Sequence, residues 1–178
     1  MFLVGLDGTQ QLTDYVVASN STFQDITSNV ETVLSWDVNT IVGGNFMHSA
    51  TVNPSRFVAI RTKFYYVRLA VLLDPKHGSQ HIIRLSLRKN GVTFLRQSIH
   101  NRPGTAIAAY PYGDQSETIE LGALLSLNAT EYLEASVYVT GIGSRLYGND
   151  LATFGYNVEP SAGVIPSTFS MMSVEGTP

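Results

Sequence analysis

The stretch that decides the fold is residues 81–99, which read HIIRLSLRKNGVTFLRQSI. In its first half, Ile and Leu side chains alternate with Arg and Ser, and a period of two is typical of a strand that buries one face. The dipeptide Asn90-Gly91 then separates two such runs. It is a strong hairpin signal because a type I′ turn needs positive φ at both central residues. The stretch therefore predicts a tight antiparallel hairpin.

Similar β-rich runs recur along the rest of the chain, and none of them shows sustained helical periodicity. Turn residues separate the runs, as in antiparallel sandwiches. The predicted fold class is all-β, an antiparallel two-sheet sandwich of about ten strands and almost no helix. The expected strands are residues 14–18, 30–36, 56–60, 64–73, 81–89, 92–99, 117–125, 131–140 and 151–158.

Residues 64–73 are apolar on both faces of the expected strand, interrupted on one face by Arg68. Such a strand is covered on both sides. One cover is the second sheet, and the other is either a neighbouring subunit or the chain's own loops. We predict subunit contact at Tyr66, Tyr132 and Tyr138, because a tyrosine ring supplies apolar area while its hydroxyl still finds a partner.

The composition limits the classes of function. Of 178 residues, 44% are hydrophobic and 14% are charged, against roughly 25% charged in typical soluble domains, so much of the surface is neutral or faces partners. No apolar run approaches the roughly 20 residues of a membrane-spanning helix, so we expect no membrane insertion. The net charge is −3 and no Lys or Arg precedes Arg56, which argues against a nucleic-acid partner.

Basic and acidic residues are segregated along the chain. Residues 75–113 hold six basic and no acidic side chains, and residues 103–144 hold five acidic and no basic ones. One interpretation is two solvated strand faces that meet across sheets or subunits in exposed ion pairs, each worth at most about 1 kcal/mol. The other interpretation is an anion-binding hairpin.

Patterns for catalysis and metal binding are missing from the sequence. The chain has no cysteine, and among its four histidines His77 and His81 are the closest pair, without zinc-like spacing. No nucleophile elbow, phosphate loop or dinucleotide fingerprint occurs. Glu117 and Glu120 differ in strand parity and so point to opposite faces, which is poor geometry for acid and base work. We predict a non-enzyme with no catalytic residue, no metal ligand and no cofactor.

Five segments carry a resemblance to a known superfamily. They are VETVLSWD at 30–37, NPSRF at 53–57, LSLRKNG at 85–91, LSLNATEYLE at 125–134 and FGY at 154–156. In order and spacing, residues 15–158 resemble the trimeric jelly roll of the C1q-like and tumour necrosis factor-like superfamily, closest to variants in phage and bacterial surface proteins. The resemblance implies a homotrimer. Because some members bind calcium, it also leaves calcium open at the expected loop residues Asp74, Asp114 and Asp150.

The predicted organisation is an N-terminal docking segment at 1–13, a jelly-roll domain at 14–158 and a C-terminal extension at 159–178. The extension holds Pro160, Gly163 and Pro166, so it is not expected to continue the sheet for long. Its apolar residues are too many for a solvated segment. We interpret it as a strap docked between subunits or, alternatively, as a tail packed on its own domain.

The expected function is a virion structural protein, either a capsid decoration, a spike or a fibre knob. It would be assembled in the host cytoplasm and sit on the virion surface among other virion proteins. The alternatives are a secreted or cell-surface C1q-like ligand-binding module, which is extracellular, and a small jelly-roll capsid shell subunit. Contact with a host-surface glycan or protein is expected at the loops 76–81, 99–112 and 141–150. The residues expected to make it are His77, His81, His100, Arg102, Tyr110, Tyr112, Arg145 and Tyr147.

Overall fold

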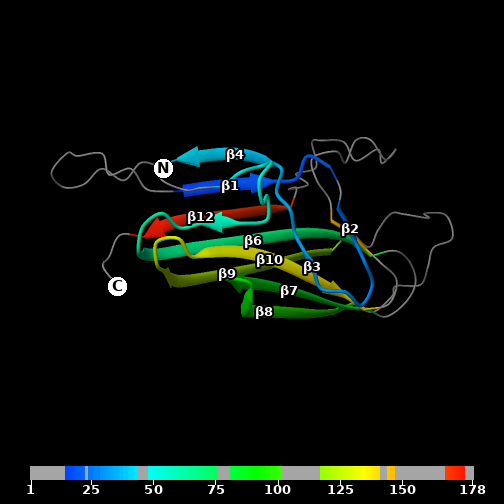
Figure 1. Ribbon diagram of the computed structural model, residues 1–178. Helices are drawn as coiled ribbons and strands as arrows, with labels where there is room; N and C mark the ends of the chain where they lie inside the picture. The colour runs from blue at the N-terminus through cyan, green and yellow to red at the C-terminus, as the bar shows by residue number, and fades with distance from the viewer. Residues whose placement is uncertain are drawn as a thin grey trace.

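The computed structural model describes residues 15–22, 24–43, 48–75, 81–101, 117–140, 144–146 and 167–174. Within these ranges the chain forms twelve β-strands and no helix. The strands make two antiparallel sheets, of seven and five strands, which stack as the two layers of a sandwich (Figure 1). The prediction of an all-β, two-sheet jelly roll is confirmed. No helix in the described part is long and apolar enough to cross a membrane.

The seven-stranded sheet is built around the long strand β6. One edge of β6 pairs with β9, and its other edge pairs with β12 and, further along, with β11. Beyond β12 follow β1 and β4, and beyond β11 follows β2. The bounds are β1 Tyr15–Ser19, β2 Gln24–Ile26, β4 Val38–Gly43, β6 Lys63–Pro75, β9 Glu117–Leu127, β11 Ser144–Leu146 and β12 Thr168–Val174.

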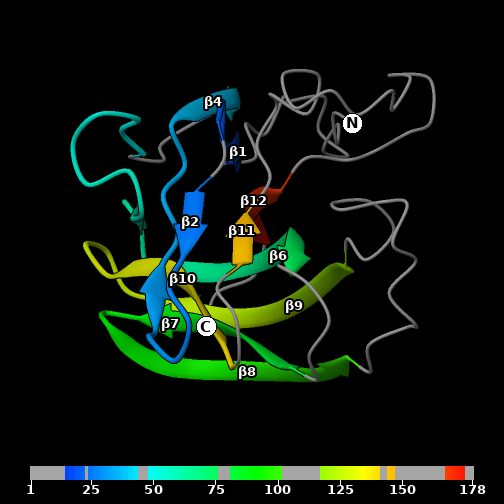
Figure 2. The same cartoon turned by 90° about the vertical axis from the view of Figure 1, so that its right-hand side faces the viewer.

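The five-stranded sheet has β8 at one edge, followed by β7 and β10 (Figure 2). The far edge of β10 pairs with two short strands, β3 and β5, at different heights. The bounds are β3 Thr32–Val33, β5 Phe57–Val58, β7 His81–Lys89, β8 Val92–Asn101 and β10 Tyr132–Val139. The register of β7 and β8 shifts between Leu87 and Arg88, which marks a bulge in this pair.

The hairpin predicted at Asn90-Gly91 is confirmed. The φ angles are 50° at Asn90 and 80° at Gly91, as a type I′ turn requires. The Asn90 side chain adds to the turn, because its Oδ1 accepts a hydrogen bond from the Tyr132 N–H at 3.0 Å. The turn therefore ties the β7–β8 hairpin to the start of β10.

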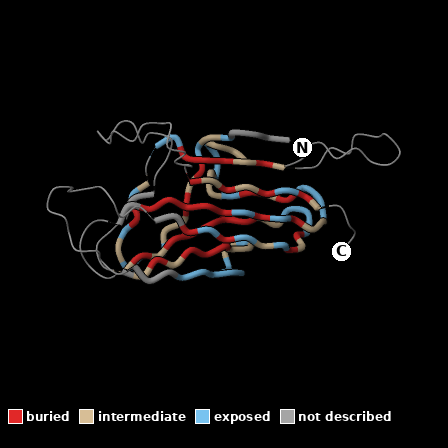
Figure 3. The backbone as a smooth tube through the Cα atoms, turned by 180° about the vertical axis from the view of Figure 1, so that it is seen from behind, coloured by how far each residue is buried: buried red, intermediate tan, exposed pale blue. Residues whose placement is uncertain are grey.

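The core lies between the sheets and follows the alternation in the sequence (Figure 3). Its centre is a column of aromatic rings from different segments. Phe57 stacks on Phe169 with 4.0 Å between ring centroids, and Trp36 meets Phe169 edge-on at 5.9 Å. His48 stacks on the other side of Phe57 at 4.4 Å, and burial lowers the pKa of its imidazole. Residues distant in sequence thus meet in one packed stack.

The predicted strand at 30–36 is shorter in the structure. The strand β3 covers only Thr32 and Val33, the Leu34 N–H still donates to the Ala135 carbonyl of β10, and the chain then crosses to the other sheet as β4. The crossing is fixed at Asp37, whose Oδ1 accepts a hydrogen bond from the Ser21 N–H at 2.6 Å. Leu34 and Trp36 are buried during the crossing, and their apolar character accounts for the longer strand expected from the sequence.

β12 corrects the predicted C-terminal boundary. The sequence predicts an extension at 159–178 that does not continue the sheet for long, whereas Thr168–Val174 lies between β1 and β6 and pairs with both. For this segment the prediction is wrong, because Phe169 and Met171 alternate into the core as in any half-buried strand. The predicted strand at 151–158 and the predicted docking segment at 1–13 lie outside the described residues.

Candidate functional site

A row of apolar side chains crosses the outer face of the seven-stranded sheet. Leu124 of β9 lies opposite Tyr66 of β6, and on the other edge of β6 Tyr66 lies opposite Met172 of β12. Tyr15 of β1 continues the row opposite Met172. Leu124, Tyr66 and Met172 are 62%, 44% and 43% exposed. We call these four residues the apolar row.

Strand parity explains why these side chains point outward. Each lies next to a core residue on its strand, as Tyr66 does beside Tyr65 and Met172 beside Met171, and neighbours on a strand face opposite sides. The Tyr66 hydroxyl extends over Gly122, where an added Cβ would lie 3.4 Å from it, in ordinary contact. The apolar row therefore exists only when these strands are paired in the folded sheet.

An ion pair borders the apolar row. The Arg68 Nη2 donates to both carboxylate oxygens of Glu120, at 2.9 and 3.0 Å. Both side chains are about half exposed, so the pair contributes little to stability. A polar rim beside an exposed apolar centre is the usual anatomy of a protein contact surface.

The edge strand β8 is a second exposed apolar surface. Val92, Phe94 and Leu95 are all exposed, Val92 by 70%, and β8 forms the lower border of the molecule in Figures 1 and 3. Among the described residues β8 pairs only with β7, so its other edge carries no strand partner there. An edge strand with exposed apolar side chains is prone to contact another chain.

The outer face of the five-stranded sheet is polar and carries a buried carboxylate. Glu134 of β10 has a side chain only 7% exposed, and it lies between two guanidinium groups. Arg88 approaches it at 3.4 Å and Arg56 at 3.9 Å. Arg56 also lies over the Tyr132 ring, 4.3 Å from its centroid. Removing either arginine would leave the Glu134 charge poorly compensated in a desolvated position.

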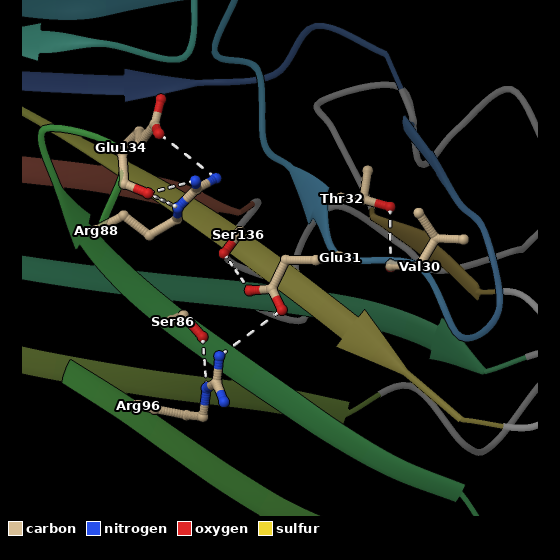
Figure 4. A network of polar contacts seen from close by, with 9 residues as sticks. Val30, Glu31, Thr32, Ser86, Arg88, Arg96, Glu134 and Ser136 are labelled. Carbon is tan, nitrogen blue, oxygen red and sulfur yellow. Dashed lines mark hydrogen bonds and ion pairs between the residues drawn. The ribbon is translucent and has the colours of Figure 1, made fainter. Parts of the chain in front are cut away.

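A second polar cluster lies in the middle of the same face (Figure 4). The Ser136 hydroxyl donates to Glu31 at 2.6 Å, and Arg96 Nε donates to the Ser86 hydroxyl at 3.0 Å. Ser136 and Ser86 face each other in the register and are fully buried. Glu31, which directly precedes β3, and Arg96 of β8 extend over these two serines. Arg96 Nη2 lies 3.7 Å from Glu31 Oε2. Small residues thus form the floor beneath two long charged side chains.

Arg84 completes the charged face. It lies opposite Tyr138 in the register, with its guanidinium 5.2 Å from the centroid of that ring. No ion pair of Arg84 occurs within the described ranges. On this face the described residues place four arginines and two glutamates. The arginines are Arg56, Arg84, Arg88 and Arg96, and the glutamates are Glu31 and Glu134.

The segregated charges of the sequence meet in one sheet. Arg88 and Lys89 of β7 pair with Glu134 and Glu131 beside them, so basic and acidic stretches contact each other within one subunit. Lys89 Nζ lies 2.8 Å from Glu131. This pair, together with the Asn128 N–H, holds the pKa of Glu131 below its usual value. The ion-pair interpretation therefore accounts for two of the hairpin cations.

The structure separates the three tyrosines predicted at a subunit contact. Tyr66 lies in the apolar row on the outer face of the seven-stranded sheet. Tyr132 and Tyr138 lie on the outer face of the other sheet, beside arginines. One sheet face therefore cannot hold all three. Sequence reasoning missed Leu124 and Met172, although Leu124 is an apolar residue at an outward parity position, next to the core residue Leu125.

Three residues predicted in contact loops lie in strands. His81 begins β7, His100 belongs to β8 and Arg145 is the middle residue of β11. The other five predicted contact residues, His77, Arg102, Tyr110, Tyr112 and Tyr147, lie outside the described residues. Contact with a host surface through these eight residues stays a prediction.

Metal-ligating side chains are scattered over the described ranges, where no group of three or more His, Asp or Glu residues could hold an ion. The acidic side chains of the five-stranded face are engaged with arginines or a serine. The two outer faces differ in what they expose: the seven-stranded sheet presents apolar side chains, and the five-stranded sheet presents guanidinium groups.

The strand order and the two stacked sheets define a tumour necrosis factor-like jelly roll, and solved structures support this class. Eiger, a TNF from S. frugiperda, is similar with a TM-score of 0.58 and 12% identity over 94% of this chain and 96% of Eiger. Murine APRIL is similar with a TM-score of 0.58 and 8% identity over 91% of this chain and 99% of APRIL. No protein-family model and no curated protein sequence matches the chain. The likeness is one of fold.

Proposed function

We propose that this protein is a non-enzymatic, homotrimeric jelly-roll module that acts in attachment on a virion surface. The apolar row is the observation that supports self-association, because Leu124, Tyr66 and Met172 expose contiguous apolar area on one sheet face. Soluble monomers seldom leave such patches in water unless they serve a contact.

Two different apolar surfaces favour a ring over a two-fold dimer. The apolar row lies on a sheet face, whereas Phe94 and Leu95 lie on the β8 edge. A contact between two unlike patches is heterologous, and it closes into a ring when the rotation permits. Three-fold closure is what the tumour necrosis factor-like resemblance implies. In such a ring the outer face of the five-stranded sheet remains free for a partner.

Placement on a virion, as a decoration, spike or fibre knob, rests on the sequence. A chain without cysteine needs no oxidising compartment, and the resemblance of its motifs to variants in phage and bacterial surface proteins supports a virion protein. The second candidate is an extracellular ligand-binding module, favoured by the shared fold with Eiger TNF and APRIL. Mass spectrometry of purified particles distinguishes the two, because only a virion protein would copurify with particles in stoichiometric amount.

Multi-angle light scattering at micromolar concentration tests the trimer. We expect three times the chain mass for the wild type and a monomer for Leu124→Lys, which places a charge in the apolar row. Val52→Lys is the matched control, because Val52 is 67% exposed in the segment between β4 and β5 and is not one of the four residues of the row. A monomeric wild type, or equal dissociation by both variants, would contradict the proposal.

A further inference from the structure

We propose that the outer face of the five-stranded sheet binds an acidic glycan, a polysaccharide that carries carboxylate or sulfate groups. The inference deepens the attachment role proposed above by naming the chemical class of the partner and the surface that takes it. It rests on side chains of β7, β8 and β10 and on Arg56.

The first argument is the balance of charge. The described residues place four arginines and two glutamates on this face, so it carries two positive charges in a chain whose net charge is −3. The opposite sheet face, by contrast, carries the balanced pair Arg68–Glu120. Positive charge is therefore concentrated on one face, where it attracts an anionic partner.

The second argument is the spacing of the guanidinium groups. Arg84 and Arg88 are four residues apart on one face of β7, which corresponds to roughly 13 Å. Arg96 of β8 lies between them in height, because it is opposite Ser86. Guanidinium groups bind carboxylate and sulfate oxygens through paired N–H donors. Arg88 already donates to the Gly91 carbonyl and faces Glu134, so Arg84 and Arg96 are the two groups placed to meet neighbouring anions of an extended polysaccharide.

The third argument is the aromatic rings beside two of the arginines. Tyr132 and Tyr138 are half-buried, and each has a guanidinium over its ring, that of Arg56 at 4.3 Å and that of Arg84 at 5.2 Å from the centroid. Each cation–π contact holds its guanidinium in place on this face, which preorganises the cation for an anionic ligand.

A long and partly exposed ion pair lies at the centre of the face. Arg96 is 3.7 Å from Glu31, and the two side chains are 43% and 36% exposed. This contact is long for a charge-assisted hydrogen bond. A ligand anion could therefore take the place of the Glu31 carboxylate at Arg96 without disturbing the buried serines beneath.

A glycan fits this face better than an acidic peptide does. An extended peptide gains most from pairing its backbone with a free strand edge. The cations lie on a sheet face, and the central strands β7 and β10 already have strand partners on both edges. The edge strand β8, whose outer edge has no partner among the described residues, exposes the apolar side chains of Val92, Phe94 and Leu95, which do not favour an acidic peptide. A polysaccharide has no such requirement, because it binds through hydroxyl groups and anionic substituents.

The test measures binding of heparin, hyaluronan and neutral dextran to the full chain by calorimetry at low salt. We expect heparin or hyaluronan to bind, dextran not to bind, and Arg84→Gln and Arg96→Gln each to weaken binding about tenfold, the cost of one charge-assisted contact. Glu31→Gln should tighten binding about threefold, because it removes a like charge at the surface and keeps an acceptor for the Ser136 hydroxyl.

Arg68→Gln is the matched control, since it removes the same charge from the opposite face. Arg88 is not substituted, because its loss would leave the buried Glu134 carboxylate without this cation. Equal weakening by Arg68→Gln and Arg84→Gln, absence of binding by both acidic glycans, or equal binding of dextran would overturn the proposal. Polyglutamate that binds as tightly as heparin would overturn it in favour of an acidic protein.

Light scattering on the same samples keeps this inference apart from the proposed trimer. A trimer that binds no acidic glycan defeats the glycan site alone. A monomer that binds heparin with the expected pattern of variants defeats the trimer alone. Melting curves of each variant show that loss of binding is not loss of the fold.

Discussion

At the scale of single residues, Gly91 carries a backbone torsion that other residues avoid. Its φ is 80°, while the nearest atom to a Cβ placed there would be the Tyr132 hydroxyl at 3.5 Å, an ordinary contact. The cost of Gly91→Ala therefore comes from the torsion and not from a clash. We expect urea unfolding to show a loss of about 1 kcal/mol or more. Val92→Ala, one residue later and highly exposed, should cost much less.

Glu131 gives a pH-dependent contribution to stability. Its folded pKa is lowered, first by Lys89 and then by the Asn128 N–H, so the stabilisation is present above the unfolded value of about 4.3 and is lost as the pH falls through the lower folded value. We expect Glu131→Gln to be less stable than the wild type at pH 7, by about 1 kcal/mol at most. In urea unfolding this difference should shrink steadily below pH 4. A difference that stays constant with pH would contradict the assignment.

At the scale of elements, β12 turns some of its side chains into the core and others toward solvent. Phe169 is fully buried and stacks on Phe57, whereas Met172 on the same strand is exposed. We expect Phe169→Ala to lower the free energy of unfolding by about 3–5 kcal/mol. Met172→Ala should change it far less when measured on the monomeric Leu124→Lys background. Similar losses for both variants would mean that the register of β12 differs from the one described.

The same strand should make the C-terminal region indispensable. A chain that ends before Thr168 loses the pairing partner of both β1 and β6 in the centre of the seven-stranded sheet. We expect this truncated chain to lack a cooperative melting transition by circular dichroism. A truncation after Val174 is the control and should melt as the full chain does. Cooperative unfolding of the shorter chain would show that β12 is not part of the core.

The elements differ in how far the sequence predicts them. The β7–β8 hairpin is predicted well because the alternation and the Asn90-Gly91 turn are local signals. β12 is missed because its membership depends on distant partners, β1 and β6, and its Ser and Met residues give only a weak local pattern. The crossing of the chain from one sheet to the other at Asp37 likewise depends on a distant residue, because the Ser21 N–H donates a hydrogen bond to the Asp37 carboxylate.

At the scale of the whole molecule, the contact surfaces depend on pairing that no local pattern reveals. The sequence shows that β6 is apolar on both faces, and this pattern indicates that the Tyr66 side chain lies on the face opposite the core. Its neighbours in the row, Leu124 and Met172, come from strands far away in the chain. The group of arginines on the other sheet arises in the same way, because the hairpin predicts its cations but not that Glu31 and Glu134 balance only part of them.

A self-associating molecule also has a concentration-dependent stability. Association that occurs only in the folded state stabilises that state by mass action, so the Tm of an oligomer rises with protein concentration. In the proposed trimer the apolar row would lose its contact with water, which would couple this burial to oligomerisation. We therefore expect the wild-type Tm to rise by several degrees between roughly 1 and 100 µM. Leu124→Lys should show a flat dependence, and Val52→Lys should follow the wild type. A flat wild-type curve would mean that the row stays in water, and the assembly would then need another surface.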